Sequence, residues 1–309
     1  MPQYTEHEYL RLAQRDFEAY DFTFALVAYN DGVYYPVGSA CLIGPGFAVT
    51  AKHVLRYMHK VVAGLTTDED SPDVKESKEG PNFNLVPDDG VGLDALQYLP
   101  NGSIRRFAVS GYIQIGYKYT DLMVLRLAPH ASSPLPNPMQ WRLPTLDLVP
   151  PKAGRKVHGY GFPDHPHCPK ISDDPWLSDH FLYQSLGEVQ RVNLEDNFKD
   201  FQTSMRTMSG MSGGPVFATH DREDRFCGII VRGGPLTDWS LIAPVWQIAY
   251  AVTNKVSGLP ERNGKLYFAD MMIQGIIPAI GAEFLTFYDK PDAEPGLTFV
   301  DRRFMENGY

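Results

Sequence analysis

A single serine stands among glycines in the last third of the chain, in the run Gly210-Met211-Ser212-Gly213-Gly214-Pro215. Glycine lacks a Cβ atom and tolerates backbone angles that other residues avoid, so this run predicts a tight turn. The next residues, Val216-Phe217-Ala218, are typical of a β-strand. A serine presented by a turn of this kind becomes a nucleophile when a neighbouring base accepts its proton.

Two upstream segments supply the groups that activate a serine. His53 ends a β-prone run over residues 46–50, and Asp121 opens the apolar run Leu122–Leu127. A histidine accepts the hydroxyl proton, and a carboxylate orients the histidine. We therefore predict that His53, Asp121 and Ser212 are catalytic, and that the backbone N–H groups of Gly210 and Ser212 bind the oxyanion of the intermediate.

These three segments, in this order, resemble those of the trypsin-like (chymotrypsin-fold) serine peptidases over roughly residues 21–250. Thr50-Ala51-Lys52-His53 is similar to the family's Thr/Ser-Ala-Ala-His segment, and the glycine run to its Gly-Asp/Asn-Ser-Gly-Gly-Pro segment. Val54 stands where digestive members carry a disulfide cysteine, so the resemblance is nearer to bacterial members without disulfides. It implies an all-β chain of two six-stranded antiparallel β-barrels, with the triad between them.

The expected domain organisation adds a segment at each end of the two barrels. Thr5 and Glu8 form a capping-box pattern, and the apolar residues that follow lie on one face of a helix. Some fifty residues after the second barrel are too few for a separate peptide-binding module, so we expect them to pack on the barrels. The predicted segments are an N-terminal helix over 1–20, a first barrel over 21–131, a second barrel over 132–255 and a C-terminal extension over 256–309.

The resemblance also assigns substrate-binding residues. Arg206, six residues before the nucleophile, and Thr207 beside it would line the floor of the primary specificity pocket, with Val231, Gly233 and Ser240 along its wall. An inward Arg206 would attract a substrate carboxylate. An outward Arg206 would leave a mid-sized pocket, formed by Thr207 and Ser240, for small or apolar side chains. Both arrangements exclude a preference for lysine or arginine.

Two other functions compete with a serine endopeptidase. The run Gly210–Gly214 also satisfies the Gly-x-Ser-x-Gly elbow of α/β-hydrolases, but that fold places its histidine well after the serine. The last histidine of this chain, His220, follows Ser212 by only eight residues. The second alternative is a pseudoprotease or protein-binding scaffold without turnover, which the intact triad disfavours. The chemistry also fits a bacterial effector protease that a regulatory protein partner controls.

Composition limits the partners and the compartment. A formal net charge of −9 argues against nucleic acid and anionic membranes as partners. The amino terminus lacks the basic and apolar regions of a secretory signal, no apolar run is long enough to span a bilayer, and three cysteines cannot form a closed set of disulfides. We therefore expect a cytoplasmic enzyme that acts on a protein or peptide substrate.

No cofactor or metal is expected either. His165, His167 and Cys168 carry ligand-type side chains, but no second ligand pair stands at a matching spacing. Cys41 and Cys227 lie in strand-like apolar runs, where buried and inert thiols are expected.

Overall fold

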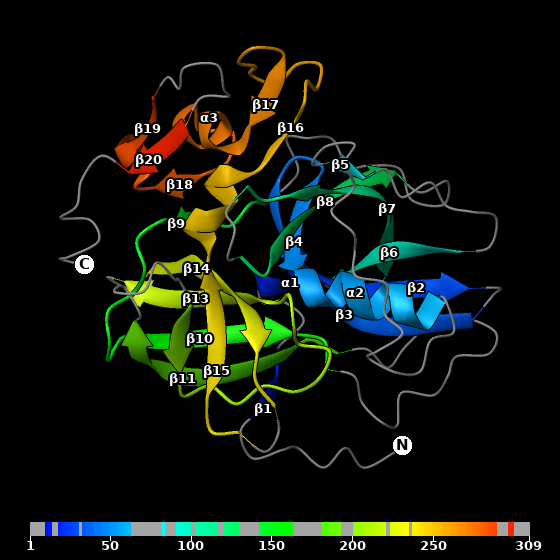
Figure 1. Cartoon of the computed structure of the whole chain (residues 1–309). Helices are drawn as coiled ribbons and strands as arrows, with labels where there is room; N and C mark the ends of the chain where they lie inside the picture. The colour runs from blue at the N-terminus through cyan, green and yellow to red at the C-terminus, as the bar shows by residue number, and fades with distance from the viewer. Residues whose placement is uncertain are drawn as a thin grey trace.

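The computed structural model describes residues 10–13, 18–30, 33–62, 82–83, 91–99, 103–116, 120–129, 142–163, 181–192, 200–220, 223–234, 237–288 and 296–299. Most of these residues lie in β-strands, which form two closed barrels (Figure 1). Most of residues 66–90, a segment rich in charged residues and proline between His53 and Asp121, lies outside the described residues, as do His165, His167 and Cys168.

The first barrel has six antiparallel strands in the order β2-β3-β4-β8-β7-β6. Within this order β7 pairs with both β8 and β6. The barrel closes because β6, the last strand in the order, pairs with β2, the first. A short strand, β5 (Asn82–Phe83), pairs antiparallel with β7. The barrel strands are β2 (Thr23–Asn30), β3 (Val33–Gly44), β4 (Phe47–Ala51), β6 (Val91–Tyr98), β7 (Ile104–Gln114) and β8 (Leu122–Pro129).

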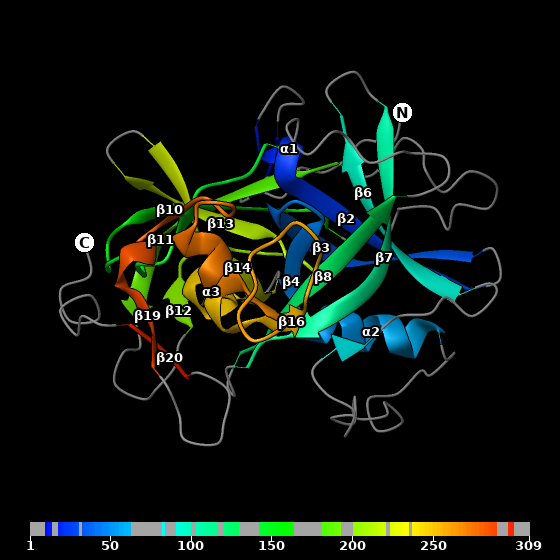
Figure 2. The same cartoon turned by 90° about the horizontal axis from the view of Figure 1, so that it is seen from above.

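The second barrel repeats this plan in the order β10-β11-β12-β15-β14-β13, and the pairing of β13 with β10 closes it. Two such barrels side by side fit the chymotrypsin fold (Figures 1 and 2). The strands are β10 (Lys156–Gly161), β11 (Tyr183–Val192), β12 (Phe201–Thr203), β13 (Pro215–His220), β14 (Glu223–Arg232) and β15 (Ser240–Pro244).

Strand β4 carries side chains buried on both of its faces. All five residues of Phe47–Ala51 are buried, so the strand does not alternate apolar and polar positions. The Phe47 ring packs edge-on against Phe268, with 5.1 Å between the ring centroids. Phe268 follows the barrels in sequence, so the C-terminal part of the chain covers β4 and adds to the core at the position that leads to His53.

The C-terminal part also extends the sheet of the second barrel. Strand β18 pairs in parallel with β9, which in turn pairs in parallel with β14. In Figure 1 these C-terminal elements, in orange and red, lie above the second barrel. Besides β9 (Leu146–Asp147), the elements of this part of the molecule are η2 (Val245–Tyr250), β16 (Val252–Asn254), β17 (Lys265–Tyr267), α3 (Phe268–Ile273), β18 (Ala279–Ile280), η3 (Ala282–Phe284), β19 (Leu285–Tyr288) and β20 (Gly296–Phe299).

The N-terminal region departs from the helix expected over residues 1–20. Leu10–Leu12 form strand β1, which pairs antiparallel with β11, and Ala19–Phe22 form the one-turn helix α1. Leu10 is buried against the second barrel. Strand β11 pairs with β12 only from Val189 onward, so its first residues can pair with β1 on that side, and this pairing overrides the helical spacing of the apolar residues. The other residues of the expected helix, 1–9 and 14–17, lie outside the described residues.

The described helices are short or amphipathic, and none is long and apolar enough to cross a membrane. The longest of them, α2 (Lys52–Val62), follows β4 directly and carries His53 in its first turn.

Candidate active site

The junction of β4 and α2 places His53 beside Asp121. The Nδ1 atom of His53 lies 2.6 Å from the Oδ2 atom of Asp121, and both side chains are about one-third exposed, 39% and 34%. The N–H group of Lys52 donates to the Asp121 carbonyl oxygen at 2.6 Å, which joins the two backbones as well. With the carboxylate accepting from Nδ1, the proton occupies that nitrogen and Nε2 keeps a lone pair that can act as a base.

A hydrogen-bonded turn fixes the position of Asp121. The Thr120 hydroxyl donates to Gln247 Oε1 at 2.5 Å and accepts from the Leu122 N–H at 3.0 Å. Gln247 is fully buried in the 3-10 helix η2. The turn that carries Asp121 is therefore bonded to the first residue of β8 and to η2, a segment that follows the second barrel.

The turn around Ser212 depends on two glycines with positive φ angles, Gly210 at 88° and Gly213 at 87°. Residues with a Cβ atom avoid this region of φ. The Gly213 N–H donates to Ile230 O at 2.8 Å, which fixes the turn to β14, and the Gly214 N–H donates to Met211 O at 3.0 Å. The backbone leaves the turn at Pro215 and enters β13, as the sequence predicts.

Two backbone donors of this turn have no acceptor within the part of the chain that the structure describes. They are the N–H groups of Gly210 and Ser212, the pair predicted to bind an oxyanion. Their neighbours in the turn, Met211, Gly213 and Gly214, all donate hydrogen bonds to carbonyl groups. Two unpaired N–H groups flanking one residue can hold a negatively charged oxygen without first breaking bonds of their own.

Ser39 links this turn to the first barrel, and sequence reasoning missed it. Its side chain is fully buried; its N–H donates to Ser212 O at 2.8 Å, and its hydroxyl donates to Gly210 O at 2.8 Å. The same hydroxyl accepts from the Phe162 N–H at 2.9 Å, and the Ser39 carbonyl accepts from the Thr50 hydroxyl at 2.7 Å. The only sequence signal for Ser39 is a small polar residue inside an apolar strand.

The structure brings Ser212 to the same junction as His53 without joining their side chains. A Cβ atom at Gly38 would lie 2.7 Å from Val54 Cγ1 and 3.1 Å from Ser212 O, so Ser212 and the neighbour of His53 flank Gly38. The Ser212 hydroxyl makes no hydrogen bond with any described residue. In ligand-free enzymes such bonds are often long and form when substrate binds.

We expect Gly213→Ala to destabilise the fold by about 3 kcal/mol or more, because the added methyl group would collide with Ser39 O and Thr50 Oγ1 at a strained φ. The matched control is Gly154→Ala, where φ is also positive but nothing lies within 4 Å of the new atom. Gly154→Ala should lower the free energy of unfolding by only about 1–2 kcal/mol. Urea unfolding measures both, and equal losses would show that the junction does not constrain Gly213.

Three of the residues predicted to bind substrate lie together. A Cβ atom at Gly233 would collide with Thr207 Oγ1 and lie 3.1 Å from Ser240 Cβ. Thr207 and Ser240 are buried, and the Ser240 hydroxyl is 2.8 Å from that of Thr203. Val231 is also buried, whereas Arg206 is exposed. Hydroxyl groups of the described residues therefore gather around Gly233, and Arg206 is an exposed side chain of the predicted set.

Neither of the two described cysteines adds chemistry to this site. Cys41 and Cys227 are free and fully buried, and burial raises the pKa of both thiols well above its ordinary value. Across the described ranges, no group of three or more His, Cys, Asp or Glu side chains is arranged to hold a metal ion.

Comparison of the chain with models of known protein families gave no match, and comparison with curated proteins gave none either.

Proposed function

We propose that this chain is a serine hydrolase of the trypsin-like class and, more specifically, an endopeptidase that cleaves protein substrates through an acyl-enzyme. The observation that carries the proposal is the hydrogen-bonded pair of His53 and Asp121 at a barrel junction that Ser39 ties to the Ser212 turn. An acid and base pair, a serine on a glycine turn and two N–H groups without an acceptor among the described residues together make up the donor and acceptor set for acyl transfer.

In this mechanism Ser212 Oγ attacks the peptide carbonyl while His53 Nε2 takes its proton. Asp121 holds the imidazole with Nδ1 protonated and stabilises the imidazolium that forms. The N–H groups of Gly210 and Ser212 donate to the oxyanion of the tetrahedral intermediate. His53 then protonates the leaving amine, and a water molecule releases the acyl group by the reverse sequence of proton transfers.

The residues around Gly233 support a preference for small side chains before the cleaved bond. Thr207 Oγ1 has no hydrogen-bond partner among the described residues, and it lies where a side chain at Gly233 would stand. The exposed Arg206 favours the outward arrangement, which leaves Thr207 and Ser240 to contact the substrate. None of these groups offers a negative charge to lysine or arginine.

We expect the purified chain to cleave a peptide library mainly after small residues, with acidic residues next and little cleavage after lysine or arginine. Mass spectrometry of the new termini measures this preference. Arg206→Ala should leave it unchanged, whereas Gly233→Ala should lower kcat/KM about tenfold or more, because the new methyl group collides with Thr207 Oγ1. Dominant cleavage after basic residues would overturn the assignment of these residues, and no cleavage of any peptide would count against the endopeptidase.

A pseudoprotease or binding scaffold is the second candidate, and one observation favours it. The Ser212 hydroxyl has no hydrogen bond to His53 or to any other described residue. A scaffold would bind peptides at the barrel junction with equal affinity in the wild type and in Ser212→Ala, without turnover in either. Cleavage by the wild type alone separates the two functions.

A further inference from the structure

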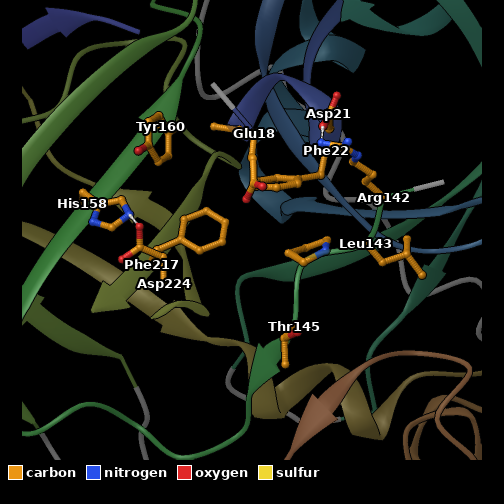
Figure 3. Close-up of a pocket in the computed structure, with 12 residues that line it drawn as sticks. Glu18, Asp21, Phe22, Arg142, Leu143, Thr145, His158, Tyr160, Phe217 and Asp224 are labelled. Carbon is orange, nitrogen blue, oxygen red and sulfur yellow. Dashed lines mark hydrogen bonds and ion pairs between the residues drawn. The ribbon is translucent and has the colours of Figure 1, made fainter. Parts of the chain in front are cut away.

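A polar cavity lies apart from the predicted triad (Figure 3). Its volume is about 530 Å³, and its walls come from α1, residues 142–145 and the strands β10, β13 and β14. His53, Asp121 and Ser212 do not line it. This volume falls in the range of pockets that hold small organic ligands. A molecule bound here would therefore be something other than the peptide at the triad.

Aromatic rings form a large part of the lining. Phe217 stacks nearly parallel to the His158 ring, with 5.7 Å between centroids and 12° between planes. Phe22 lies 5.3 Å from Phe217 on the α1 side, and Tyr160 meets His158 edge-on. Such faces carry negative electrostatic potential, which attracts a cation placed against them.

The charged groups of the lining are mostly acidic. His158 Nε2 lies 3.3 Å from Asp224 Oδ2, and Arg142 Nη1 lies 3.1 Å from Asp21 Oδ2. Burial lowers the pKa of His158, and Asp224 offsets this only in part, so the imidazole is neutral at neutral pH. Three carboxylates therefore face one guanidinium, and the lining has a net negative charge.

Glu18 is the lining carboxylate for which the described part of the chain provides no partner. No described residue forms an ion pair or hydrogen bond with it, although Asp21 and Asp224 are both paired. In Figure 3 its side chain extends from the α1 side toward the centre of the cavity. An unpaired carboxylate beside aromatic faces can bind an ammonium group while the rings hold an apolar body.

We propose that this cavity binds a small organic cation, an amine attached to an apolar or aromatic group, through Glu18 and the rings of Phe22 and Phe217. The site does not depend on peptidase activity, so its test is a binding measurement.

One strand is shared between this cavity and the Ser212 turn. His158 of β10 and Phe217 of β13 line the cavity, and β13 begins at Pro215, where the Ser212 turn ends.

The test is isothermal titration of the full chain with benzylammonium, and with benzyl alcohol and benzoate of similar size. We expect a Kd of roughly 1 mM or tighter for benzylammonium, and weaker binding of the neutral and anionic compounds. Glu18→Gln should weaken benzylammonium binding about three- to fivefold, whereas the exposed control Glu188→Gln should leave it unchanged. Equal binding of the three compounds, no binding of any, or equal affinity in the two variants would each overturn the proposal.

Phe217→Leu provides a second variant that keeps the charge of the cavity and removes one aromatic face. It should weaken benzylammonium binding about threefold while Glu18 still contributes. Because Phe217 is buried, circular dichroism first establishes that the variant is folded, and Tyr98→Leu, which removes a ring outside this cavity, serves as its matched control. An equal loss of benzylammonium affinity in Phe217→Leu and Tyr98→Leu would show that the Phe217 ring does not contact the ligand.

Discussion

Replacing Ser212 with alanine is expected to lower kcat for peptide cleavage about a millionfold. The remaining rate is the one that substrate binding and the oxyanion donors provide without a nucleophile. Loss of the nucleophile in a serine triad has an effect of this size, because the remaining groups cannot form the acyl-enzyme. The fold should be preserved, since Ser212 is tied to Ser39 through its backbone carbonyl rather than its hydroxyl. Single-turnover assays measure the rate, and urea unfolding should show a change of less than about 0.5 kcal/mol.

Ser209→Ala is the matched control, because Ser209 is an exposed serine three residues before the nucleophile on the same turn. Its activity should stay within about twofold of the wild type. Turnover that survives in Ser212→Ala but is lost in Ser209→Ala would place the nucleophile elsewhere.

Asp121→Asn is expected to lower kcat about ten-thousandfold with little change in KM. An asparagine amide can present N–H rather than oxygen to His53 Nδ1, and the imidazole then carries its proton on Nε2, where it cannot accept the serine proton. The backbone bond from Lys52 N to Asp121 O does not involve the side chain, so the turn should persist. Steady-state kinetics on one cleavable peptide separate kcat from KM, and a variant that changes only KM would show that Asp121 does not set the tautomer.

The resemblance of three short segments to the trypsin-like peptidases implied the two barrels, and local patterns predicted the elements that carry His53 and Ser212. The glycine run around Ser212 requires positive φ angles, and the structure has them at Gly210 and Gly213. The apolar run before His53 forms β4 and leads directly into α2. Both signals lie within about ten residues, which is the range over which periodicity and turn chemistry are informative.

Features that depend on long-range contacts could not be predicted in the same way. Ser39 acts through partners far along the chain, at Gly210 and Phe162, and one buried serine in a strand gives no sign of them. The helical spacing from Leu10 onward fails because the edge of β11 pairs with this segment as a strand. The cavity near Glu18 gathers residues from several separated segments, so no single motif marks it.

Intact-mass spectrometry after treatment with a fluorophosphonate shows whether Ser212 is an activated nucleophile. We expect one adduct on the wild type, located at Ser212, none on Ser212→Ala, and strongly slowed labelling of His53→Ala, because the reagent needs a serine whose proton is removed by a neighbouring base. A folded wild-type chain that stays unlabelled, or a Ser212→Ala variant that is labelled as fast as the wild type, would contradict the account.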